Sequence, residues 1–75
     1  MGLKYIVINS FQIMLFAPHI DHGYFFRRVQ ETSKDNVTGA GRVSSDWRCY
    51  GESVSLGIGV GKTDQDVLDH AMRGA

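Results

Sequence analysis

The sequence predicts an α+β domain whose strands and helices follow one another in the order ββαββα. Two apolar runs separated by Asn9-Ser10 open the chain, which is typical of a β-hairpin. A glycine-rich second half alternates bulky and small side chains over residues 47–60, which is the period of a strand. Two further segments have the apolar spacing of short helices. We expect a four-stranded, mainly antiparallel sheet that carries two helices on one face.

The first hairpin is predicted from residues 3–8 and 11–16. Residues 3–8 are apolar at both alternating positions, which indicates a strand that is buried on both faces. Pro18 ends the second run, because proline has no N–H to donate to a strand ladder. A single helix across both runs is the alternative.

Both helices are expected to begin at a capping residue. Asp21 is the expected N-cap of a helix that ends near Gln30, with Ile20 and Phe25 placed to form a hydrophobic staple. Thr63 is expected to cap the last helix, whose first turn is acidic, as the helix dipole favours. The apolar face of that helix consists of Val67, Leu68, Ala71 and Met72.

The second half predicts two strands of different character. Residues 37–43 form a weak candidate, because two of them are glycines that contribute no side-chain packing. After a turn at residues 44–46, one long strand is expected over residues 47–60. Trp47 falls on its face of small side chains, so either Trp47 packs over the sheet edge or a bulge near Gly51 changes the register. That nearly bare face is covered either by a partner or by the domain's own helices.

Size and charge limit the classes of protein to consider. A chain of 75 residues, 43% of them hydrophobic, allows one small domain over residues 1–75 and excludes a two-domain enzyme. Eight Lys and Arg balance eight Asp and Glu, which argues against a dedicated binder of polyanions. A domain of this length buries only about 60% of the surface that its unfolded chain exposes. Self-association is therefore a reasonable way to gain buried area.

No motif in the sequence specifies a reaction or a cofactor. The string from Gly57 to Thr63 resembles a phosphate-binding loop, but Leu56 stands where that motif needs its first glycine. His19 and His22 are close in sequence, yet a chain with one cysteine lacks the paired ligands of a structural zinc site. We therefore expect no catalytic residues, no enzymatic activity, no metal and no cofactor.

The number of cysteines and the apolar run at the start of the chain together predict the cellular location of the protein. Cys49 is the only cysteine, so no intrachain disulfide can form, and a cytoplasmic location is expected. Its strand-like neighbours are typical of a packed thiol rather than of a nucleophile. The apolar run that opens the chain contains polar residues and stops at Pro18, which is too short to span a bilayer. We expect no membrane contact.

Candidate contact residues are aromatic or basic and concentrate in the second half. Three of them, Trp47, Arg48 and Tyr50, lie together at the start of the predicted long strand, and Arg42 lies on the strand before it. Aromatic and Arg side chains are frequent anchors of protein interfaces. The same residues, together with Arg27 and Arg28, could stack on bases and contact phosphates of single-stranded nucleic acid.

The run from Cys49 to Gly57, CYGESVSLG, together with KYIVI at residues 4–8, resembles small uncharacterised proteins of bacteria and their phages. The resemblance implies a compact, cytoplasmic accessory protein encoded by a phage or prophage, of a kind that binds and inhibits a host or defence component. The leading hypothesis is a non-enzymatic protein-protein interaction module that forms a homodimer or binds one bacterial protein. The alternative is a small single-stranded nucleic-acid-binding protein.

Overall fold

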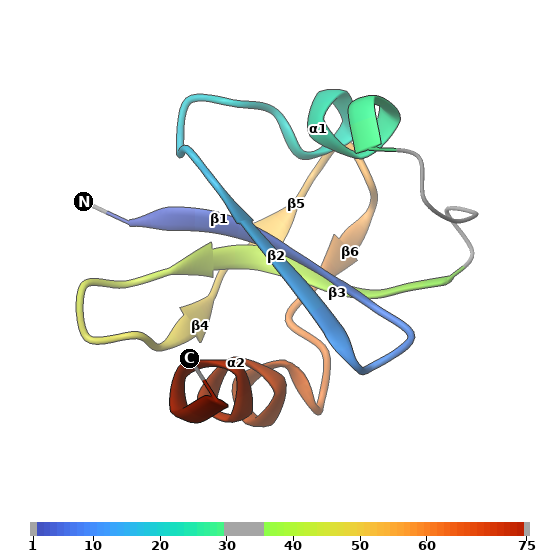
Figure 1. Cartoon of the computed structure of the whole chain (residues 1–75). Coiled ribbons are helices and arrows are strands. Elements are labelled where there is room, and N and C mark those ends of the chain that lie inside the picture. The colour runs from blue at the N-terminus through green and yellow to red at the C-terminus, as the bar shows by residue number, and fades with distance from the viewer. Residues whose placement is uncertain (1, 30–35, 75) are drawn as a thin grey trace.

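The computed structural model describes residues 2–29 and 36–74 and contains one four-stranded sheet, one two-stranded sheet and two helices (Figure 1). Its elements in chain order are β1 (Leu3–Ile8), β2 (Gln12–Phe16), α1 (His22–Val29), β3 (Val37–Val43), β4 (Cys49–Tyr50), β5 (Glu52–Ser53), β6 (Ile58–Gly59) and α2 (Asp64–Gly74). The larger sheet has the order β2-β1-β3-β4, and every pair in it is antiparallel. The α+β class and the four-stranded antiparallel sheet are confirmed.

Strand β1 is buried on both faces, as its apolar pattern predicts. Ile6 and Ile8 belong to an apolar cluster on the α1 side of the sheet, which also contains Phe16 and Phe26. Tyr5 and Val7 point to the opposite side and pack in a second cluster with Val43 and Leu68 of α2. Because β1 lies between β2 and β3, it is the central strand on which both clusters depend.

The prediction that both helices cover one face is wrong. Phe26 of α1 and Leu68 of α2 belong to different clusters, and Figure 1 shows the two helices on opposite sides of the β1–β3 ribbons. The reason is that β1 presents large apolar side chains on both faces, so each face needs its own cover.

The single long strand predicted over residues 47–60 is also wrong. Gly51 has a φ of +79°, and the chain leaves the large sheet there. It then forms the hairpin of β5 and β6, whose turn contains Gly57 at a φ of +69°. Both glycines adopt the left-handed conformation that a side chain disfavours. The bulky residues after Gly51 consequently do not share one buried face: Val54 is 85% exposed whereas Leu56 is buried.

The predicted positions of both helix starts agree with the structure, and the predicted side-chain cap is shown at Asp21. The backbone N–H of Tyr24 donates to Asp21 Oδ2 at 3.1 Å, which makes Asp21 the N-cap of α1. Ile20 and Phe25 both pack against the α1-side cluster, as the staple requires. The expected end of this helix near Gln30 lies outside the described residues. Thr63 directly precedes α2, and its carbonyl accepts from the Val67 N–H at 2.9 Å.

Candidate protein-interaction surface

Four of the six predicted contact residues lie on the hairpin of β3 and β4, and we call these four the hairpin surface: Arg42, Trp47, Arg48 and Tyr50. Arg42 and Tyr50 face each other across the two strands, so their side chains project to the same side. Trp47 is 42% exposed and Tyr50 is 47% exposed, while both arginines are exposed. The structure therefore places two half-exposed aromatic rings and two cations on one hairpin, whose strands β3 and β4 are labelled in Figure 1.

The turn that presents Trp47 is held by its own backbone. The Trp47 N–H donates to the Ser44 carbonyl at 2.9 Å, and the Ser44 N–H donates to the Arg48 carbonyl at 3.0 Å. The Ser44 hydroxyl also donates to the Asp46 carboxylate. Trp47 has a φ of +64°, a conformation that is uncommon for a bulky residue and costs free energy. The surrounding hydrogen bonds keep the residue in that conformation.

A glutamine of α2 fixes the other side of this hairpin. Gln65 Oε1 accepts from the Cys49 N–H at 2.8 Å, and Gln65 Nε2 donates to the Trp47 carbonyl at 2.9 Å. The amide group thus pairs with the outer edge of β4 as a neighbouring strand would. A partner strand is blocked at this edge, so contact through the hairpin surface depends on side chains.

The two remaining candidates, Arg27 and Arg28, lie on α1 and not on the hairpin. Both are exposed, and the Arg28 guanidinium lies 5.9 Å from the centre of the Tyr24 ring, within the range of a cation–π contact. The basic residues predicted to act together are therefore divided between two separate elements.

Sequence reasoning missed a buried polar pair on the α2 side. The Tyr5 hydroxyl donates to Asp64 Oδ2 at 2.6 Å, and the Gly61 N–H donates to the same oxygen at 2.7 Å. Both side chains are fully buried, and Asp64 Oδ1 has no hydrogen-bond partner among the described residues. Burial raises the pKa of Tyr5 far above its usual range, and the bond to Asp64 raises it further. Tyr5 therefore keeps its proton and acts as a donor.

The pair connects residues that are 59 positions apart and needs glycine on β3. A Cβ on Gly39 would overlap both carboxyl oxygens of Asp64. Gly39 therefore provides space for a carboxyl group and does not merely weaken the strand. A glycine inside the strand was the signal in the sequence for this close approach.

Cys49 is partly buried and His22 is buried, and burial favours the uncharged form of each side chain. Burial raises the pKa of the Cys49 thiol, which lowers the fraction of reactive thiolate. His22 is 4% exposed, and its Nε2 lies 2.9 Å from the Gly41 carbonyl oxygen. Burial lowers the pKa of His22, so the neutral ring is favoured. Within residues 2–29 and 36–74, no group of three or more His, Cys, Asp and Glu side chains could hold a metal ion.

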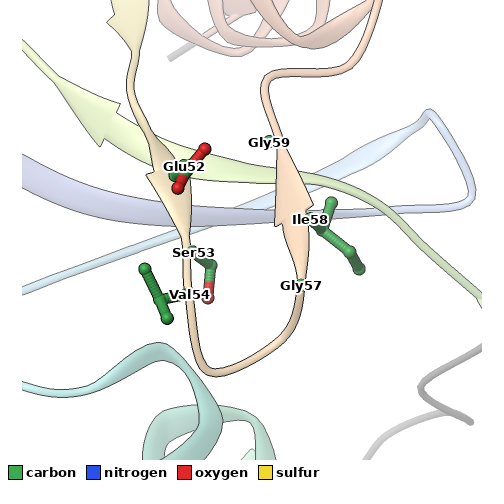
Figure 2. Close-up of a pocket in the computed structure, with 6 residues that line it drawn as sticks. All are labelled: Glu52, Ser53, Val54, Gly57, Ile58 and Gly59. Atoms are coloured by element: carbon green, nitrogen blue, oxygen red, sulfur yellow. The ribbon is translucent and has the colours of Figure 1, made fainter.

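The glycine-rich string from Gly57 to Thr63 contributes to a turn, to β6 and to the start of α2. The Gly61 N–H donates to the Asp64 carboxyl group and so is not available to a phosphate. A shallow pocket of about 290 Å³ lies on the β5–β6 hairpin (Figure 2). Its lining residues are Glu52, Ser53, Val54, Gly57, Ile58 and Gly59. Because Glu52 is the only ionisable residue there, the pocket offers no acid–base pair.

Comparisons with protein-family models, curated proteins and solved structures found no match to this chain. The resemblance to small bacterial and phage proteins therefore stays a prediction. None of the helices in the described part of the chain is long and apolar enough to cross a membrane.

Proposed function

We propose that this protein is an interaction module that binds one bacterial partner protein through the hairpin surface. In this proposal it is a cytoplasmic accessory protein, encoded by a phage or prophage, that inhibits a host or defence component. The observation that supports the proposal most directly is the half-exposure of Trp47 and Tyr50 on a hairpin held by backbone and Gln65 hydrogen bonds.

Aromatic side chains on a rigid support suit protein recognition for two reasons. Trp, Tyr and Arg are the residue types most enriched among interface residues whose truncation is costly. A contact that is already held in one conformation also loses less conformational entropy on binding. Here the strained backbone of Trp47 is kept in place by the Ser44 turn and by α2, which supports a binding role over a purely packing role.

The test compares capture of proteins from bacterial lysate by three immobilised baits. The baits are the wild-type chain, the double variant Trp47→Ala/Tyr50→Ala, and Tyr24→Ala as a matched control that removes an exposed aromatic ring from α1. We expect at least a roughly tenfold loss of one specific bound protein for the double variant only. Equal capture by all three baits would contradict the proposal. If circular dichroism shows that Trp47→Ala unfolds the domain, Tyr50→Ala alone is used for the comparison.

A second candidate function is binding of single-stranded nucleic acid. It is favoured by the position of Arg42 and Arg48 beside exposed aromatic rings, because bases stack on such rings while cations contact phosphates. Labelled oligonucleotides whose retardation weakens as salt rises would support it. A strictly monomeric protein that retards oligonucleotides would place this candidate above protein binding.

A further inference from the structure

The large sheet has two edge strands, β4 and β2, which differ in what occupies their outer sides. Gln65 accepts from the Cys49 N–H of β4 and donates to the Trp47 carbonyl in the turn that precedes β4. In the part of the chain that the structure describes, β1 is the only sheet neighbour of β2. Among the described residues, the backbone of residues 13–16 forms hydrogen bonds with β1 and with no other element. One edge of the sheet is therefore occupied and the other is open.

The open edge lacks the features that normally prevent a sheet edge from pairing with another chain. Such edges usually carry charged residues, a proline or a bulge. Residues 5–20 contain no Asp, Glu, Lys or Arg, and Pro18 lies beyond the end of β2. Leu15 on β2 is 37% exposed, and Phe11 in the preceding turn is 83% exposed. An uncharged apolar edge of this kind favours strand addition.

The turn before β2 is held by hydrogen bonds to the segment at the start of β3. Asn9 and Ser10 both have a φ near +55°, which is uncommon for residues other than glycine. Their N–H groups donate to the Asn36 carbonyl and to Thr38 Oγ1, each at 2.9 Å. These bonds attach the turn that precedes β2 to residues 36–38.

We propose that β2 pairs antiparallel with β2 of a second copy of this chain, about a twofold axis close to Met14. A twofold axis close to Met14 places Met14 beside its own copy and Leu15 opposite Ile13 of the second copy, so charged residues on this strand would bring like charges close together and cause repulsion. The absence of charge on β2 removes that repulsion. Because Gln65 occupies the only other edge of the large sheet, growth stops at the dimer and the two sheets form one eight-stranded sheet.

This interface is independent of the hairpin surface, which lies at the opposite edge of the sheet. A dimer formed through β2 carries one hairpin surface at each end of the joined sheet. Two such surfaces let the dimer engage a repeated or dimeric partner with higher avidity than a single chain.

The test measures molar mass by analytical ultracentrifugation from about 1 µM to about 1 mM, a range chosen to span weak and tight association. Three chains are compared: wild type, Leu15→Lys on β2, and Val54→Lys as a control at an exposed apolar residue of the β5–β6 turn. We expect a concentration-dependent dimer for wild type and Val54→Lys. Leu15→Lys should weaken the dimer by roughly tenfold or more, because pairing would bury an unpaired cation. If Leu15→Lys does not fold, Gln12→Lys takes its place.

Amide hydrogen exchange then locates the interface. Backbone amides of residues 13–16 should become more protected as concentration rises, whereas those of β4 should not change. A wild-type chain that stays monomeric up to 1 mM overturns the proposal, as does a dimer that Leu15→Lys leaves intact or that forms without protection of β2. Trp47→Ala/Tyr50→Ala should stay dimeric, so failure of the hairpin proposal and failure of this one are distinguishable.

Discussion

The two faces of the large sheet are closed in different ways. On the α1 side, the cluster around Ile6 and Ile8 is apolar and is covered by α1 and, through Leu56, by the β5–β6 hairpin. On the α2 side, a smaller apolar cluster lies beside a buried carboxyl group, Asp64, which the Tyr5 hydroxyl contacts. The difference shows how one short helix can be positioned on a face with few apolar partners. Hydrogen bonds set its location where apolar area alone is small.

The α2 side also determines the position of the hairpin surface. Asp64 bonds to Tyr5 of β1, and the next residue, Gln65, bonds to Cys49 and Trp47. The first turn of α2 is therefore attached to the central strand and to the edge strand at the same time. We therefore expect substitutions that break the Tyr5–Asp64 hydrogen bond to change the conformation of the hairpin surface. Substitutions on the α1 side should leave that conformation unchanged.

The largest expected effect comes from Gly39→Ala, because the new Cβ would overlap the Asp64 carboxyl group. Displacing that group breaks its bond to Tyr5, and we expect a loss of about 3 kcal/mol in the free energy of unfolding. Gly59→Ala is the matched control, since its Cβ would lie at an ordinary 3.7 Å from Glu52 Cβ. Urea denaturation of the two variants measures the difference. Equal stability would show that the α2 side tolerates displacement of Asp64.

Tyr5→Phe tests the hydrogen bond without changing the packing. It removes the phenol donor and leaves Asp64 Oδ2 with the Gly61 N–H alone, inside a fully buried site. We expect a loss of about 2 kcal/mol, which is typical when a buried polar group loses its partner. Tyr24→Phe removes a hydroxyl from a ring that is 51% exposed and should change stability by less than about 0.5 kcal/mol. Similar values for both variants would mean that the Tyr5 bond does not stabilise the α2 side.

The smallest expected effect is a pH dependence that arises on the α1 side. Burial lowers the pKa of His22 from its ordinary value of 6.5, and the nearby positive charges of Lys4 and Arg42 lower it further. The folded protein therefore binds this proton less readily than the unfolded chain. The neutral His22 ring therefore makes its full contribution to the free energy of unfolding above about pH 6.5. That contribution decreases as pH falls through the folded-state pKa, by at most about 1.4 kcal/mol per pH unit.

Denaturation curves between pH 7.5 and 5 measure this loss. His22→Gln, which retains a polar group able to reach the Gly41 carbonyl, should reduce the pH dependence over that range. An unchanged slope in the variant would assign the titration to another group. His19→Gln, at an exposed position, serves as the control.

Local features of the fold were predictable where neighbouring residues decide them. The Asn9-Ser10 turn, the termination at Pro18 and the Asp21 cap each depend on a few adjacent residues, and the structure has all three. Of the candidate contact residues, Trp47, Arg48, Tyr50 and Arg42 were correctly expected to lie close together on one hairpin. The break at Gly51 was anticipated only as a bulge, because periodicity alone does not show that a strand leaves its sheet.

The α+β class could be predicted from the sequence, because apolar spacing and capping and turn residues act over a few positions. Tertiary structure decided which face each helix covers, since β1 is apolar on both sides and local pattern favours neither. It also decided that Gly39 and Asp64 meet, because only the folded sheet brings residues 25 positions apart into contact. The contrast between the β4 edge and the β2 edge has the same origin: Gln65 reaches β4 only after α2 has packed on the sheet.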